Sequence, residues 1–130
     1  MRHATCSCGQ LAVLCEGEPV RVSVCHCLAC QQRTGSAFGA QARFPADRVK
    51  IEGQATEFTR VGDAGGRATF RFCGTCGSTV CWSADTLPGF VTVALGAFAD
   101  PSFPSPTVSI YETRKHAWCA ISGDGVEHYE

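Results

Sequence analysis

Three clusters of cysteines constrain the fold of this chain more than any other feature. Cys6-Ser-Cys8 and Cys73-Gly-Thr-Cys76 are each followed by a glycine, and Cys25-His-Cys-Leu-Ala-Cys30 places three cysteines within a few residues. These clusters hold seven of the 10 cysteines in 130 residues. Clustered cysteines at this density are typical of a disulfide scaffold or of a metal-binding domain.

The lack of long apolar segments favours metal ligands over disulfides. No apolar signal segment follows Met1, and the apolar runs are far shorter than the roughly 20 residues of a membrane helix. We therefore expect a cytoplasmic protein that has no membrane partner and keeps its cysteines reduced. Its 11 Lys and Arg balance 12 Asp and Glu, for a formal net charge of −1. This balance predicts no broad basic face, so we expect no nucleic-acid partner.

Short runs of β-branched and aromatic residues, separated by Gly, Pro, Asp and Ser, predict an all-β fold. The expected strands are Gln10–Cys15, Val20–Cys25, Ser36–Phe44, Val49–Glu52, Thr56–Val61, Ala68–Cys73, Thr79–Ser83, Val91–Leu95, Thr107–Tyr111 and Trp118–Ile121. Helical turns are expected only at Leu28–Arg33 and Glu112–His116. Without repeats or a linker, residues 1–130 are expected to form one domain of short antiparallel sheets.

The spacing of the outer clusters predicts a closed zinc site. Structural zinc takes four thiolates tetrahedrally, and two pairs that are distant in sequence tie one domain together. Cys6, Cys8, Cys73 and Cys76 form such a set, and the glycines allow backbone amides to approach the sulfurs. A rubredoxin-like iron site or an iron–sulfur cluster could use similar pairs. A thioredoxin-like role for the Cys73 pair is disfavoured, because no βαβ pattern surrounds it.

The remaining cluster predicts an open zinc site. Cys25, Cys27 and Cys30 would cap one face of a metal and leave a fourth position for water or substrate. Two closed sites would need eight clustered cysteines, one more than the chain offers. We expect His26 to lie outside the ligand set, near the metal or in solvent. Cys81 or another lone cysteine could instead close the site.

The remaining cysteines and the tryptophans are expected to pack in the core. These are Cys15, Cys81, Cys119, Trp82 and Trp118.

The motifs resemble those of a known family. Cys6-Ser-Cys-Gly, Cys25-His-Cys-Leu-Ala-Cys-Gln-Gln-Arg-Thr-Gly-Ser-Ala-Phe and Phe72-Cys-Gly-Thr-Cys-Gly-Ser, in this order, are similar to the glutathione-dependent formaldehyde-activating enzymes, a family that includes centromere protein V. The Ile110-Tyr-Glu…Trp118 stretch resembles the closing motif of that family. The resemblance covers nearly the whole chain. It implies an all-β zinc fold of the Mss-four-like superfamily, with two zinc ions, of which the Cys25, Cys27 and Cys30 zinc is the active one.

The resemblance also implies a reaction and its partners. The family joins formaldehyde to glutathione to give S-hydroxymethylglutathione, which is carbon–sulfur lyase chemistry in the reverse direction. A thiolate bound to this zinc would need nearby cations or amide donors, and we expect these from Arg33, Gly35 and Ser36. The alternative is a non-catalytic zinc-binding module for protein interaction.

Overall fold

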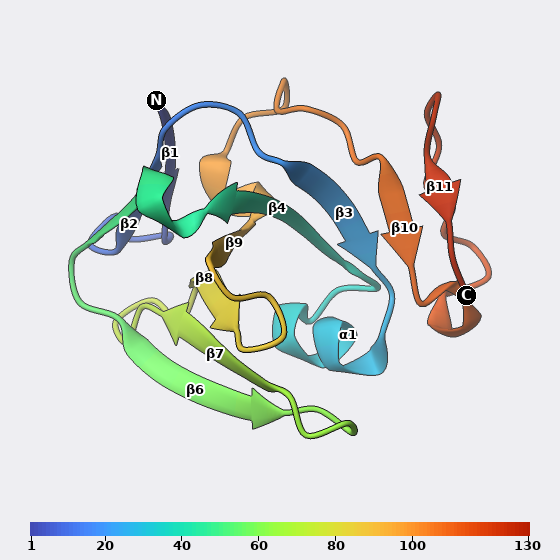
Figure 1. Cartoon of the computed structure of the whole chain (residues 1–130), viewed down its shortest axis with the longest axis horizontal. Helices are drawn as coiled ribbons and strands as arrows, with labels where there is room; N and C mark the ends of the chain where they lie inside the picture. The colour runs from blue at the N-terminus through green and yellow to red at the C-terminus, as the bar shows by residue number, and fades with distance from the viewer.

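The computed structural model describes all 130 residues, and most of its regular structure is β-strand (Figure 1). The strands are β1 (Arg2–Thr5), β2 (Ala12–Cys15), β3 (Arg21–Cys25), β4 (Gly39–Pro45), β5 (Val49–Glu52), β6 (Thr56–Val61), β7 (Arg67–Phe72), β8 (Thr79–Ala84), β9 (Phe90–Ala94), β10 (Val108–Ile110) and β11 (Glu127–His128). The α-helix α1 (Leu28–Thr34) and three 3-10 turns (Ala46–Arg48, Leu95–Phe98 and Glu112–Arg114) complete the fold. The expected all-β class is confirmed.

The strands form two sheets. One has three strands in the order β1-β2-β5, and the other has eight in the order β11-β10-β3-β4-β9-β8-β7-β6. Neighbours pair antiparallel except at β10, which runs parallel to both β3 and β11. The larger sheet is therefore mixed, whereas the sequence suggested antiparallel sheets only. Parallel neighbours need a long connection, and residues 111–126 supply it between β10 and β11, whereas β4 to β9 lie between β3 and β10 in the chain.

The hydrophobic core draws side chains from both sheets. Phe44 of β4 is fully buried and lies 6.1 Å from the ring of Phe98, which stacks on Phe103 at 4.5 Å between ring centroids. The lone cysteines Cys15 and Cys81 belong to the same core. Their burial, and that of Cys119 and Trp82, agrees with the sequence expectation.

The expected strand Trp118–Ile121 is wrong, and Trp118 is not a core residue. The Trp118 side chain is 75% exposed. The backbone turns at this point, because the N–H of Cys119 donates to the carbonyl of His116 at 3.0 Å. Lys115 Nζ also donates to the carbonyl of Cys119, over 2.8 Å. Local hydrogen bonds thus use polar groups that a sheet ladder would need.

Other differences lie at the ends of elements. Strands β1 and β11 were not expected, because two to four mixed residues carry no alternating pattern. The expected helix at 28–33 is confirmed as α1, and the expected turn at 112–116 is a 3-10 turn over Glu112–Arg114. No helix of the structure has the length and apolar character needed to cross a membrane.

The larger sheet curves, and its β6–β7 hairpin lies below α1 in Figure 1. Helix α1 follows β3 directly and returns the chain to β4. The arrangement places the middle cysteine cluster, at the β3–α1 junction, near the inner face of the β6–β7 hairpin.

Candidate metal centres

Two matching turns bring the outer cysteines together. Both Gly9 and Gly77 have a φ of +84°, which only glycine adopts without strain. In the first turn Gly9 N–H donates to the carbonyl of Cys6 at 3.1 Å, and in the second Gly77 N–H donates to that of Cys73 at 2.7 Å. Each turn therefore presents its two sulfurs on one side. The glycine that follows each pair is the sequence signal for this geometry.

Several N–H groups point at the sulfurs of these turns. Cys73 Sγ accepts from the Gln10 side chain at 3.0 Å, from the Thr75 amide at 3.4 Å and from the Cys76 amide at 3.5 Å. These hydrogen bonds lower the pKa of Cys73 to about 7, and the Gln10 bond has the largest effect. Cys6 Sγ likewise accepts from the Leu11 amide at 3.3 Å. The chain thus favours a thiolate at Cys73 before any metal is considered.

Gln10 is a ligand-supporting residue that the sequence analysis missed. Its amide group also donates to the Gln54 carbonyl at 2.7 Å and accepts from the Gln54 amide at 3.0 Å. Gln54, two residues after β5, thus holds the Gln10 side chain against Cys73. No sequence signal marks a glutamine for this role, because its partners lie far along the chain.

The four outer cysteines fit a tetrahedral zinc ion. A tetrahedron of sulfurs about 2.3 Å from zinc has edges of about 3.8 Å. Cys8 Sγ lies 3.7 Å from Cys6 Sγ and 3.6 Å from Cys73 Sγ. All four sulfurs, including that of Cys76, lie within 4.8 Å of one another. The donor set is all thiol, which suits zinc and other soft metals.

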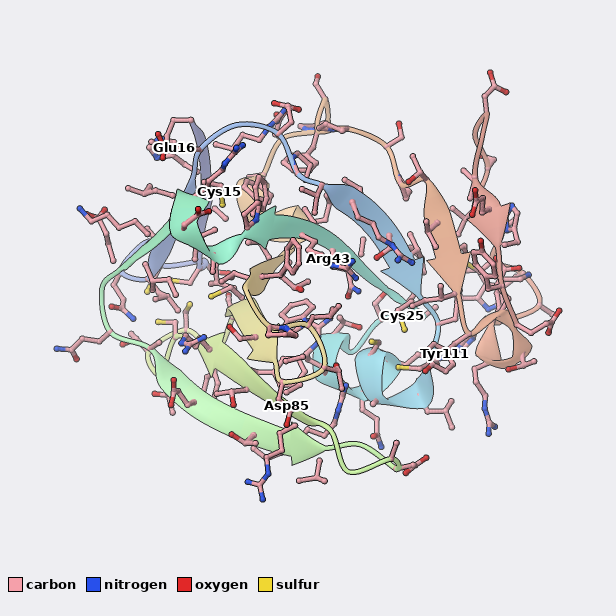
Figure 2. All side chains as sticks on the ribbon, viewed as in Figure 1. Cys15, Glu16, Cys25, Arg43, Asp85 and Tyr111 are labelled. Atoms are coloured by element: carbon pink, nitrogen blue, oxygen red, sulfur yellow. The ribbon has the colours of Figure 1, made fainter.

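The middle cluster forms where β3 meets α1. Cys25 ends β3, Cys27 is the N-cap of α1, and Cys30 lies in its first turn. The Cys30 amide donates to Cys27 Sγ at 3.3 Å, so the helix cap itself brings these two residues together. Figure 2 shows Cys25 at this junction, with further sulfur atoms nearby.

The three middle sulfurs also have metal-binding geometry. They lie within 4.8 Å of one another, and no other Cys, His, Asp or Glu atom joins the group. Cys81, which the sequence allowed as a fourth ligand, lies in the hydrophobic core instead. The cluster therefore offers three ligands on one side and leaves the other side to a further group.

The three thiols do not lose their protons alike. The Cys25 and Cys30 thiols donate to the sulfur of Cys27 and lower its pKa, and the positive charge of Arg60 lowers it further. Hydrogen bonds with Cys27, which has the largest effect, and with Cys30 raise the pKa of Cys25. Cys27 is therefore the first of the three to become a thiolate, and Arg60 is near enough to influence it.

Comparison with known proteins identifies the family of this chain. A family model described as "Glutathione-dependent formaldehyde-activating enzyme" matches residues 1–114. The chain belongs to this family. The match includes all three cysteine clusters, so the resemblance noted in the sequence is confirmed.

A solved structure of a Rhodobacter sphaeroides protein has a similar fold. Its TM-score to this chain is 0.58 at 21% sequence identity, and the match covers 73% of this chain and 85% of that chain. Similarity at this identity supports the fold alone. A search of curated proteins finds no match.

Arg33, one of the expected substrate-binding residues, lies beside the middle cluster of this family member. Gly39 makes room for it, since a Cβ at residue 39 would lie 2.9 Å from Arg33 Nη2 and 3.5 Å from Cys30 Cβ. The guanidinium carbon lies 4.2 Å from the ring centroid of Trp82. Burial lowers the pKa of Arg33. Its Nε and Nη2 atoms are buried and have no hydrogen-bond partner.

The expected amide donors are already engaged within the chain. Gly35 caps α1 with a φ of +69°, and its N–H donates to the Gln31 carbonyl at 2.8 Å. The Ser36 amide donates to Thr34 Oγ1 at 3.0 Å. Gly35 and Ser36 therefore end the helix, and Arg33 is the expected binding residue with unused donors.

His26 is buried rather than solvated and stands outside the cysteine group. Its Nε2 atom lies 3.0 Å from Ser109 Oγ on β10, while Nδ1 has no partner. Its backbone N–H donates to the Ile110 carbonyl at 3.1 Å. These contacts join the β3–α1 junction to β10.

Arg60 is a second cation that the sequence analysis did not single out. It extends from β6 with its guanidinium carbon 5.1 Å from the Phe70 ring centroid. It lines a cavity of about 420 Å³, which we call the Phe58 groove. The residues of the groove that matter below are Phe58, Arg60, Phe70 and Phe72 of the β6–β7 hairpin and Gln32 and Arg33 of α1. Arg60 has no fixed spacing from the cysteines, so only the fold brings it there.

Proposed function

We propose that this protein is a zinc enzyme of carbon–sulfur bond chemistry, which joins a thiol to formaldehyde or cleaves a related thiol–carbonyl adduct. The observation that carries the proposal is the three-cysteine cluster with an open side, next to the buried and unpaired donors of Arg33. Membership of the formaldehyde-activating family supports the same reaction class.

Two zinc ions per chain would divide the work between the clusters. Cys6, Cys8, Cys73 and Cys76 would hold a structural ion, because they fill all four positions. Cys25, Cys27 and Cys30 would hold the second. A zinc ion with three thiolates and a free position favours the deprotonated form of a thiol placed near it.

In the proposed reaction, the sulfur of the thiol attacks the carbonyl carbon of formaldehyde. A carbon–sulfur bond forms, the π electrons of the carbonyl move to oxygen, and that oxygen takes up a proton to give the S-hydroxymethyl product. The reverse reaction breaks the same bond and returns both compounds. Glutathione is the thiol that the family name suggests.

The residues of the chain would balance charge during this reaction. Three thiolates and a substrate thiolate bring more negative charge than one divalent ion offsets. Arg33 places a partly desolvated guanidinium beside Cys30, and Arg60 acts on Cys27 from β6. Cations in such a desolvated position stabilise negative charge more strongly than they would in water.

Exchange NMR of glutathione and formaldehyde would test the proposal directly. The zinc-loaded protein should accelerate interconversion between the free thiol and its hydroxymethyl adduct. Cys27→Ser should abolish the acceleration while the four-cysteine centre and the fold remain. Cys15→Ala, an apolar change at a core cysteine outside both centres, is the control and should retain it. No acceleration with glutathione or with other small thiols would favour the interaction module instead.

A further inference from the structure

The Phe58 groove combines an apolar wall with two cations. Side chains alternate along a strand, so Phe58 and Arg60 lie on one face of β6. Phe58 pairs with Phe70 across the hairpin, and Phe70 pairs in turn with Trp82 of β8. The rings of Phe70 and Trp82 are in contact at 5.3 Å between centroids, and the guanidinium groups of Arg33 and Arg60 both lie over the Phe70 ring.

No carboxylate of the chain lies in the groove, and the anionic groups nearest to Arg33 and Arg60 are the thiols of the middle cluster. None of the residues that line the groove is acidic. The nearest acid along β6, Glu57, belongs to the opposite face and pairs with Arg71 at 3.2 Å. Neither Arg33 nor Arg60 forms an ion pair, although each lies against the Phe70 ring, at 5.7 Å and 5.1 Å from its centroid. The rings stabilise the cations in part but offer no hydrogen-bond acceptor, and Nε and Nη2 of Arg33 have no partner.

Phe58 also leaves apolar surface free in the groove, because its side chain is 60% exposed. An anion would supply the acceptors that Arg33 and Arg60 lack, and a flat apolar body would cover Phe58. Glutathione supplies carboxylates but no such body.

We propose that the Phe58 groove binds a carboxylate that carries an aromatic or similarly flat apolar group. The carboxylate meets Arg33 and Arg60, and the apolar group lies on Phe58 and Phe72. The binding inference stands on the groove alone. A further step, that this compound is the thiol or the aldehyde substrate of the enzyme, rests on the proposed function.

Calorimetric titration of the zinc-loaded protein with 3-phenylpropionate tests this inference. We expect saturable binding, weakened about tenfold or more when the probe is replaced by 3-phenylpropanamide, which lacks the charge, or by propionate, which lacks the ring. Arg60→Gln and Phe58→Ala should weaken 3-phenylpropionate binding to a similar extent. Both side chains reach solvent, so these variants are expected to fold.

Matched controls separate the groove from general surface effects. Arg67→Gln removes an exposed arginine elsewhere on the same hairpin, and Val61→Ala removes an exposed apolar side chain from the same strand. Neither should change the affinity by more than about twofold. The inference is overturned if 3-phenylpropionate does not saturate, if its amide or propionate binds equally well, or if Arg67→Gln matches Arg60→Gln. Probe-independent self-association, measured by sedimentation, would instead identify the groove as an interface between copies of the chain.

The thiol–formaldehyde exchange measurement on the same samples keeps the two proposals apart. Exchange without 3-phenylpropionate binding would overturn the groove inference alone. Binding without any exchange would overturn the proposed reaction and leave the groove as a binding site.

Discussion

Replacing one cysteine in each centre by serine should affect stability very differently. Cys73→Ser removes a buried sulfur from the four-cysteine centre, and Cys27→Ser removes one from the three-cysteine centre. Serine at residue 27 remains a good N-cap for α1, so the second change removes a thiolate with little other damage. The pair therefore isolates what each metal centre contributes to folding.

The expected difference follows from the length of chain that each centre ties together. Cys8 and Cys73 are 65 residues apart, so joining them restricts the unfolded chain by about 4 kcal/mol, treating the metal link as a covalent one. Cys25 and Cys30 are five residues apart in the sequence, and the same expression gives about 2 kcal/mol. Against a total stability of about 5–15 kcal/mol for a small domain, only the first loss threatens the fold.

Metal analysis and urea unfolding provide the measurement. The wild-type protein should contain two zinc ions, and Cys27→Ser should contain one and unfold at a slightly lower urea concentration. Cys73→Ser should lose the other zinc ion and about 4 kcal/mol of stability, so its urea midpoint should fall much further than that of Cys27→Ser. Equal destabilisation by both changes would refute the division into a structural and an open centre. One zinc ion in the wild-type protein would refute the two-site proposal.

Three further outcomes are expected. Gly53→Ala and Gly65→Ala should both cost about 1–2 kcal/mol of backbone strain, because both glycines have a positive φ. Gly53→Ala should cost well over this amount, because its Cβ would lie 1.8 Å from the Gln10 carbonyl oxygen. Equal urea midpoints for the two variants would contradict this. Gln10→Ala removes the largest cause of the lowered Cys73 pKa, so that pKa should rise. Zinc is retained at pH values above the pKa of the thiol and released below it. As the pH is lowered, zinc release from Gln10→Ala should therefore begin at a higher pH than from the wild-type protein, and a chromogenic chelator measures this release. Gln54→Ala keeps the backbone groups that bond to Gln10 and should leave the pH of zinc release unchanged. Brief chelator treatment of the wild-type protein should remove one of its two zinc ions, because the open centre is more accessible to a competing ligand. The treated protein should lose exchange activity but keep its circular dichroism spectrum. Simultaneous loss of both ions would contradict this.

Local signals were sufficient where neighbouring residues form the structure. The Cys-x-Cys-Gly and Cys-x-x-Cys-Gly turns follow from glycine at positive φ and from amides that bond to sulfur within the turn. The start of α1 was likewise predictable, because Cys27 caps the helix that contains Cys30. Trp118 was not, since its apolar character suggests burial whereas the local turn leaves it exposed.

The sequence by itself determined how the cysteines divide into a set of four and a set of three. Two closely spaced pairs that are distant in the sequence can together fill four metal positions, whereas the three cysteines of the middle cluster fill only three. Only the tertiary structure decided what surrounds the open set. The pairing of β6 with β7 and of β7 with β8 brings Arg60 near Cys27 and places Phe58 and Phe70 in one groove with Arg33 of α1. Strand pairing acts over long sequence separations, so no spacing in the chain encodes that neighbourhood.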